Sequence, residues 1–213
     1  WSTAKSVVSA LIGIAVERGE IANIDIPVST YIPQWGGNDN EVVTIRALLE
    51  MRSGFAPIPG PAALYQQSDQ LSASINRELV QPPHRQWSYV NEDSMLLSGI
   101  IEAATGQSAA QYARDVLFEP IGMEGEWWSD GAGHTLTYCC IDSTPRDFAR
   151  FGLLYARGGM WKDRVVVPAA WVGESTRALP EAPWYALHWW RSFVHPGMFY
   201  SKGHHEQNIY VVP

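Results

Sequence analysis

Residues 1–5, Trp-Ser-Thr-Ala-Lys, open the chain and are followed at once by the apolar run Val-Val-Ser-Ala-Leu-Ile-Gly-Ile-Ala-Val at 7–16. This run is apolar on nearly every side of a helix, which predicts a buried central helix rather than a surface one. Ser2 is expected in the first turn, and Lys5, three residues further on, shares its helix face. The stretch therefore predicts a serine and a lysine in contact at the head of a buried helix.

This pairing has a chemical reason to be reactive. A serine hydroxyl is a poor nucleophile until a base takes its proton. Lys5 can be that base only as a neutral amine, and burial in apolar surroundings lowers the pKa of a lysine. The helix N-terminus adds backbone N–H groups and a positive dipole end near the reacting oxygen. The plainer alternative is that Ser2 caps the helix and Lys5 is a solvated first-turn residue.

Composition bounds the kinds of protein this chain can be. It has 213 residues, of which 46% are hydrophobic and 17% charged, enough for one large domain or two small ones. The formal charge of −7 argues against nucleic acid or an anionic membrane surface as partner. No window approaches the roughly 18 unbroken apolar residues of a membrane span. The ten tryptophans predict broad aromatic packing or a cleft lined with rings.

The two ends of the chain predict a fragment of a longer protein. There is no initiator Met, and residues 209–213, Ile-Tyr-Val-Val-Pro, have the pattern of a strand that stops in mid-sheet. The compartment therefore stays open, since periplasmic, secreted and cytoplasmic locations all fit such a fragment. Cys139 and Cys140 are adjacent, and because neighbouring cysteines rarely bridge we expect two small buried apolar side chains and no disulfide.

Helical periodicity dominates most of the chain, and strand patterns gather at its C-terminal end. We expect helices at 45–51, 64–80, 95–104, 108–118 and 145–155, and strands at 184–193, 198–200 and 208–212. Strands segregated from helices predict an α+β fold with an antiparallel sheet. We expect a single domain over 1–213, with the central helix at about 1–20, a mostly helical region at 21–183 and a partial sheet at 184–213, incomplete because the ends are missing.

A second motif, Tyr89-Val90-Asn91, lies between the Pro-Pro break at 82–83 and a helix, where a loop can present side chains to a cleft. A phenol hydroxyl can relay a proton between a serine, a lysine amine and a leaving group. An asparagine amide can hold a substrate carbonyl and contact the lysine at once. The alternative is a loop tyrosine that packs its ring and leaves its hydroxyl in water.

Together, the Ser-x-x-Lys at residue 2 and the Tyr-x-Asn at residue 89 resemble the motifs of the penicillin-recognising serine hydrolases, specifically the class C β-lactamase-like branch. That branch includes esterases, D-aminopeptidases, D,D-peptidases and 6-aminohexanoate-oligomer hydrolases. Three further stretches are similar to family hallmarks, namely 44–54 (TIRALLEMRSG), 117–123 (LFEPIGM) and 143–152 (STPRDFARFG). The resemblance covers nearly the whole chain and implies a helical region beside an antiparallel sheet of the β-lactamase and D,D-peptidase type.

The resemblance also implies a third motif, Lys-Thr-Gly or His-x-Gly, on the strand that edges the active site. The matching stretch is 202–207, Lys-Gly-His-His-Glu-Gln, and His204 falls where the family has Lys or His. His205 and Glu206 stand where close relatives have two glycines, which let substrate lie against the strand backbone. We expect Glu206 to crowd that edge and to place its charge near a developing oxyanion.

The resemblance implies acyl transfer through a covalent acyl-enzyme. Ser2 is the expected nucleophile, Lys5 and Tyr89 together accept its proton and pass it to the leaving group, and Asn91 orients the substrate. The expected substrate is a small molecule: an ester, a small amide, a D-amino-acid peptide or a β-lactam. The implied mechanism needs no cofactor.

Backbone N–H groups of Ser2 and Gln207 are the implied oxyanion hole, and His204 is expected to add hydrogen bonding or positive charge from the strand side. A rival hypothesis is a catalytically weak binding or sensing module of the same fold, for which Glu206 is the main support. A third is a purely structural fragment whose incomplete sheet leaves its strands exposed.

The histidines near the C-terminal end suggest a metal site as another alternative, formed by His204, His205 and Glu206 with His188 or His195. Adjacent residues on a strand point to opposite faces, so two neighbouring histidines are not expected to share one ion. We therefore predict no metal site.

Overall fold

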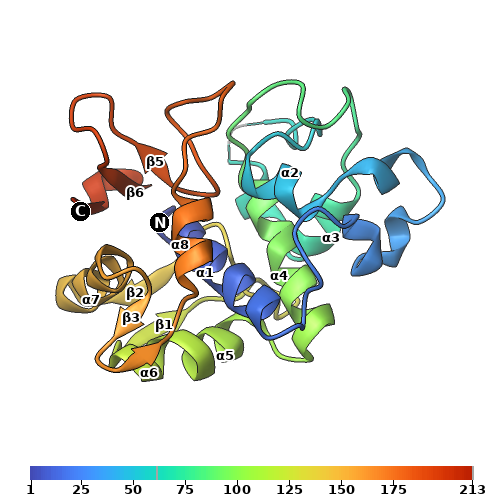
Figure 1. Ribbon diagram of the computed structural model, residues 1–213. Coiled ribbons are helices and arrows are strands. Elements are labelled where there is room, and N and C mark those ends of the chain that lie inside the picture. Colours follow the sequence, from blue (N-terminus) through green and yellow to red (C-terminus); the bar gives the residue numbers. More distant parts are fainter. Residues whose placement is uncertain (61, 213) are drawn as a thin grey trace.

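The computed structural model describes residues 1–60 and 62–212 of the chain. One long helix, α1 (Ala4–Glu17), runs through the middle of the molecule, and the other helices pack around it (Figure 1). A three-stranded antiparallel sheet lies beside the N-terminal end of this helix. The structure confirms the predicted α+β fold class.

Helix α1 is the buried element that its apolar sequence predicts. Every side chain from Ala4 to Ala15 is buried. A Cβ atom on Gly13 would lie 2.2 Å from Cγ of Trp171, so only glycine permits this close approach of the indole ring. The helix begins at Ala4, slightly later than expected, but the Lys5 N–H donates to the Ser2 carbonyl oxygen at 3.0 Å. Ser2 therefore lies in the turn that leads into the helix.

The remaining α-helices enclose α1 from several sides. Within the described residues they are α2 (Ile45–Leu49), α3 (Gln70–Ile75), α4 (Asn91–Thr105), α5 (Ala109–Ala113), α6 (Glu119–Ile121), α7 (Pro145–Ala156) and α8 (Ala169–Ser175). Thr44 caps α2 by accepting a hydrogen bond from the Ala47 N–H at 3.2 Å. Thr144 caps α7 in the same way from the Asp147 N–H at 3.2 Å. Both helix starts follow the rule that a threonine hydroxyl satisfies a free N–H of the first turn.

All strand pairs of the described chain are antiparallel and short. They are β1 (Gly125–Trp127) with β2 (Ile141–Ser143), β3 (Met160–Trp161) with β4 (Arg164–Val165), and a sheet ordered β5 (Trp190–Arg191), β6 (Phe199–Gly203), β7 (Gln207–Val211). In this sheet Gly203 pairs with Gln207, so residues 204–206 form the turn between β6 and β7. Strand β6 packs on α1 and β7 on α7, which brings the turn to the head of the central helix.

Two expected elements are shorter than their patterns predict. The helix expected at 64–80 is a single turn at 64–66 followed by α3, because Asp69 starts a new helix by accepting from the Ser72 N–H at 2.8 Å. The strand expected at 184–193 is reduced to β5, because His188 takes a left-handed conformation with φ of 63° that interrupts an extended chain.

In the described part of the chain, no helix combines the length and apolar character needed to cross a bilayer.

Candidate active site

The amine of Lys5 is the centre of a cluster that joins three distant segments. Its Nζ atom lies 3.2 Å from Ser2 Oγ and 2.8 Å from Asn91 Oδ1. The carbonyl oxygen of Tyr138 lies 3.0 Å from the same nitrogen. The structure thus places Ser2 and Asn91 within hydrogen-bond distance of the Lys5 amine, as the pairing of the two motifs predicts.

Burial sets the protonation of this amine. Lys5 is 2% exposed, and desolvation lowers the pKa of its amine to about 7, while the Glu92 carboxylate opposes the shift. Near neutral pH the neutral amine is therefore well populated. The physical cause is the same apolar packing that makes α1 a core helix, since a buried cation loses its hydration.

The partners of Lys5 also orient its lone pair. A neutral amine offers two N–H donors and one lone pair. The Tyr138 carbonyl oxygen can only accept, and the Asn91 amide presents its oxygen to Nζ. Once these two acceptors take the N–H groups, the lone pair faces Ser2 Oγ. In the neutral form of the amine the serine hydroxyl can donate to Lys5 Nζ, whereas the ammonium form donates to Ser2 Oγ at 3.2 Å.

Tyr89 lies against the same amine. Lys5 Nζ is 4.9 Å from the centroid of the Tyr89 ring. Burial raises the pKa of the Tyr89 hydroxyl to about 12, and a contact with the Ser2 side chain offsets part of that shift. The hydroxyl is therefore protonated at neutral pH and lies beside the serine, so the structure excludes the alternative of a tyrosine directed to bulk water.

Aromatic packing and backbone hydrogen bonds fix the loop that carries Tyr89. The Tyr89 ring centroid lies 5.7 Å from that of Trp190 and 6.3 Å from that of Tyr185. The Ser88 N–H donates to the Met51 carbonyl oxygen at 2.9 Å, just beyond the end of α2. Part of the tryptophan content thus serves the packing around the site, as composition predicts. Asn91 itself is the first residue of α4, so the second motif spans the junction between loop and helix.

His188 is a buried histidine that holds the site-bearing helices together. Its carbonyl oxygen accepts from Ser6 Oγ at 2.8 Å, its Nδ1 lies 2.9 Å from the Leu49 carbonyl oxygen and its Nε2 lies 2.9 Å from Ser94 Oγ. Burial, with the nearby Lys5 charge, lowers the pKa of His188 to about 3, so the ring is neutral. It must then donate from Nδ1 to the carbonyl and accept at Nε2. This residue links α1, α2 and α4, a role that the sequence does not signal.

The turn between β6 and β7 closes the site from the sheet side. Thr3 Oγ1 donates to the Gln207 carbonyl oxygen at 2.7 Å, which fixes the start of β7 beside Ser2. The turn residues His205 and Glu206 have φ of 58° and 60°. Non-glycine residues disfavour this left-handed region. These are the two positions where the family resemblance implies glycine, so the conformation agrees with that expectation.

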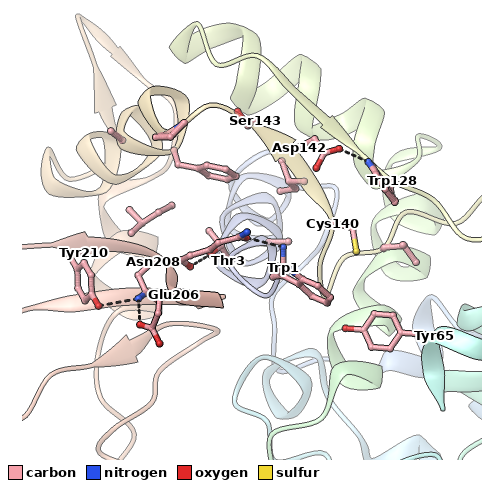
Figure 2. Close-up of a pocket in the computed structure, with 18 of the residues that line it drawn as sticks. Trp1, Thr3, Tyr65, Trp128, Cys140, Asp142, Ser143, Glu206, Asn208 and Tyr210 are labelled. Carbon is pink, nitrogen blue, oxygen red and sulfur yellow. Dashed lines mark hydrogen bonds between the residues drawn. The ribbon is translucent and has the colours of Figure 1, made fainter. Parts of the chain in front are cut away.

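Glu206 and Gln207 line a cavity of about 1160 Å³ next to this turn. Trp1, Thr3, Glu206 and Tyr210 surround it in Figure 2, and the described lining includes neither Ser2 nor Lys5. Trp1 and Thr3 flank Ser2 in the chain, so the cavity adjoins the segment that carries this residue. Glu206 is exposed, and Asn208 Nδ2 donates to its carboxylate at 3.4 Å. Its expected repulsion of an oxyanion stays a prediction.

Two expectations about this region are wrong. His204 and His205 do not point to opposite faces, because they lie in the turn between β6 and β7 rather than within a strand, and their ring centroids are 3.9 Å apart. Cys139 and Cys140 are not free apolar side chains but form a disulfide, because the chain turns at Cys140, where φ is 71°. Within residues 1–60 and 62–212, no three or more His, Cys, Asp or Glu side chains are grouped so that they could hold a metal ion.

Comparison with known proteins gives a consistent picture. The chain matches the family Beta-lactamase over residues 1–213. The Bacillus subtilis (strain 168) protein PbpX, provisionally named a penicillin-binding protein, is 28% identical over 123 residues, which is 57% of this chain and 30% of PbpX. The matched stretch thus spans under a third of this relative.

Solved structures show the same fold. A Bacillus anthracis protein, provisionally named a 6-aminohexanoate-dimer hydrolase, superposes with a TM-score of 0.86 at 24% identity, over 98% of this chain and 62% of that protein. A penicillin-binding protein homologue from Caulobacter crescentus gives a TM-score of 0.79 at 16% identity, over 100% of this chain and 73% of the homologue.

Proposed function

The chain belongs to the beta-lactamase family, and from this premise we propose that it is a serine hydrolase that acts through a covalent acyl-serine intermediate. The observation that supports this best is the setting of Lys5. Its buried amine has a pKa of about 7 and lies 3.2 Å from the hydroxyl of Ser2. A plain helix cap needs no buried base beside it, so this contact favours catalysis over the structural alternative.

In the proposed acylation, Ser2 Oγ attacks the substrate carbonyl carbon while its proton passes to Lys5 Nζ. The new C–O bond moves the carbonyl electron pair onto oxygen, which becomes an oxyanion. The lysine is then an ammonium with three N–H donors, and the oxygens of Ser2, Asn91 and Tyr138 lie within 2.8–3.2 Å to receive them. The site thus offers the developing cation more hydrogen-bond acceptors than the neutral amine can use, which favours the proton transfer.

The backbone N–H groups of Ser2 and Gln207 are the proposed oxyanion hole. The contact between Thr3 Oγ1 and the Gln207 carbonyl oxygen supports this, because it holds both backbones at the head of α1. His204 is proposed to assist from the strand side. Its ring lies 5.2 Å from that of Trp1, centroid to centroid, so the sheet turn and the residue before the nucleophile are packed together.

Leaving-group departure requires a proton donor. We assign this role to Tyr89, whose hydroxyl stays protonated at neutral pH and lies beside Ser2. The proton is replaced from the Lys5 ammonium, 4.9 Å from the ring centroid, and water then hydrolyses the acyl-serine. Asn91 is proposed to orient the substrate through its amide. The proposed substrates are small molecules with an activated carbonyl: esters, amides, short peptides or β-lactams.

A second candidate function is a penicillin-binding or sensing module that acylates and deacylates slowly. The left-handed conformation of His205 and Glu206, together with the acidic charge of Glu206 at the turn, favours it. The two candidates differ in the fate of the acyl-serine. A hydrolase releases product with repeated turnover, whereas a sensing module accumulates a stable adduct after one equivalent of substrate.

A fluorophosphonate probe followed by mass spectrometry tests both candidates. We expect the adduct on the Ser2 peptide, no adduct in Ser2→Ala, and full labelling of the matched control Ser88→Ala, whose side chain is exposed. An adduct on Ser53 or Ser88 contradicts the assignment. A burst of p-nitrophenol without further turnover, from a p-nitrophenyl ester, then identifies the sensing module.

A further inference from the structure

The disulfide between Cys139 and Cys140 follows directly on a residue that contacts the candidate base, Lys5. Tyr138, whose carbonyl oxygen accepts from Lys5 Nζ at 3.0 Å, is the residue immediately before it. Cys139 is buried, whereas Cys140 is half-buried and lines the cavity beside the site. Figure 2 shows the Cys140 sulfur on the cavity side, between Tyr65 and Trp128 in that view. The disulfide therefore joins the core to a surface that a small reagent can reach.

The turn that contains the disulfide is fixed at several points. Trp127 Nε1 donates to the Cys139 carbonyl oxygen at 2.8 Å, and the Trp128 N–H donates to the Cys140 carbonyl oxygen at 3.0 Å. The Tyr138 hydroxyl donates to Gln70 Oε1 at 2.6 Å. These bonds involve the carbonyl groups of Cys139 and Cys140 and the Tyr138 side chain, not the Tyr138 carbonyl itself. Cys140, with φ of 71°, is the one member of this turn in a conformation that a non-glycine residue disfavours.

We propose that the Cys139–Cys140 disulfide is a redox-sensitive positioning element, and that its reduction by a dithiol slows the acylation of Ser2. The bridge closes a small ring that contains the peptide bond between the two cysteines, so it restrains Cys140 in its left-handed conformation. Without the bridge, Cys140 relaxes toward ordinary φ values and turns the preceding peptides. The Tyr138 carbonyl oxygen then leaves Lys5 Nζ. This inference rests on the proposed function.

The redox step is a thiol–disulfide exchange with a dithiol such as dithiothreitol. One reagent thiolate attacks the Cys140 sulfur from the cavity side, which forms a mixed disulfide and releases the Cys139 thiolate. The second thiol of the reagent then attacks the reagent sulfur that is bonded to Cys140, which releases the Cys140 thiolate. The reagent leaves as a cyclic disulfide, and the two cysteines each take up one proton. Two electrons pass from the dithiol to the protein, and an oxidising reagent reverses the step.

The loss of the carbonyl contact acts on the rate of the chemical step. The lone pair of Lys5 is directed at Ser2 only while two acceptors hold its N–H groups, so a displaced carbonyl leaves the amine free to rotate. A misplacement of about 1 Å at a reacting group can lower a rate by ~10²-fold. We expect reduction to slow labelling of Ser2 by a fluorophosphonate by about tenfold or more, with little change in the concentration that saturates the rate.

A pair of double variants separates the bridge from the conformation that it holds. Cys139→Ala/Cys140→Gly removes the bridge but allows the left-handed conformation, because glycine adopts it without strain. Cys139→Ala/Cys140→Ala removes the bridge and retains a Cβ atom. We expect the glycine variant to be labelled faster than the alanine variant, and both to be insensitive to dithiothreitol. A bridge with a purely structural role predicts equal rates for the two variants.

The experiment measures the labelling rate of full-length oxidised protein, dithiothreitol-reduced protein and both variants. Alkylation with iodoacetamide counts the thiols. We expect no alkylated cysteine before reduction and both alkylated after it. Free thiols before reduction, equal rates in the two redox states, or equal rates for the two variants overturn the proposal. If Ser2 is labelled in neither the oxidised nor the reduced protein, the proposed function itself fails. That result differs from equal labelling of Ser2 in both redox states, which overturns only the role of the disulfide.

Discussion

The low pKa of Lys5 makes a quantitative prediction about stability and pH. Burial lowers this pKa from 10.5 to about 7. At 1.36 kcal/mol per pKa unit, this shift lowers the free energy of unfolding by about 5 kcal/mol while the lysine is charged in both states. Below pH 7 this penalty on the folded state is fully present. It decreases as pH rises from 7 to 10.5, because in that window the unfolded chain binds the extra proton.

Lys5→Met isolates this effect, since methionine has a similar shape and no titration. Urea unfolding of wild type and Lys5→Met at pH 7.5 and pH 9.5 measures it. The wild type is expected to gain about 2.5 kcal/mol of unfolding free energy relative to the variant over these two pH units. Titrating groups that do not interact with the Lys5 charge contribute equally to both proteins and cancel in the difference.

The same pKa predicts the pH profile of acylation. The rate of fluorophosphonate labelling of Ser2 is expected to rise with pH to a plateau, with a midpoint near 7, because only the neutral amine accepts the serine proton. Parallel stability curves for wild type and Lys5→Met, together with a labelling midpoint above pH 9, contradict the argument. Such results mean that Lys5 keeps its ordinary pKa in the folded protein. The proposal that Lys5 is the base for Ser2 then loses its main support.

Three further predictions concern other parts of the site. Glu206→Gly is expected to raise kcat on a p-nitrophenyl ester, in a protein that includes any flanking segments. It is also expected to stabilise the turn by about 1 kcal/mol, because φ there is 60°. Glu206→Gln is the control that separates charge from bulk, and an unchanged kcat in both variants contradicts the proposed repulsion. Tyr89→Phe is expected to lower kcat by ~10²-fold with little effect on KM, since it removes the proton relay and keeps the ring; an unchanged kcat in a steady-state assay rejects that role. His188→Ala is expected to lower the unfolding free energy by about 2 kcal/mol, because it removes the ring that contacts the buried Ser94 hydroxyl on α4, while the Leu49 carbonyl oxygen keeps the backbone N–H of residue 188. Chemical denaturation measures this, and a change below about 1 kcal/mol refutes the linking role.

The part of the site that could be predicted from sequence is the part that obeys helix spacing. Ser2 and Lys5 are three residues apart at the head of a buried helix, so their contact follows from the spacing of helical turns. The approach of Asn91, 86 residues from Lys5, follows only from the resemblance to a family, because no local pattern specifies which loop returns to which helix. The α+β class could likewise be predicted, since strand patterns gather at one end of the chain.

The contacts that sequence analysis missed are made by backbone atoms and by the fold around them. The Tyr138 carbonyl group carries no signature of residue type, and its position depends on the turn at 137–140. His188 has the sequence context of a strand residue, yet its left-handed conformation directs it into the core. The disulfide was missed for a related reason: extended neighbours point apart, and only the turn at Cys140 brings the two sulfurs together.

Reactivity and stability are opposed at the centre of this molecule. The apolar run of α1 supplies the core, and the same burial removes water from Lys5 and lowers its pKa. A more polar helix would restore an ordinary, protonated lysine, whereas a helix with no lysine would fold more stably at neutral pH. The presence of an ionisable side chain within the buried part of α1 therefore favours a functional role, since packing alone favours an apolar residue there. The structure compensates with the oxygens of Asn91 and Tyr138, which can accept both N–H groups of the neutral amine, and with Ser2 Oγ, which can accept the third N–H of the ammonium.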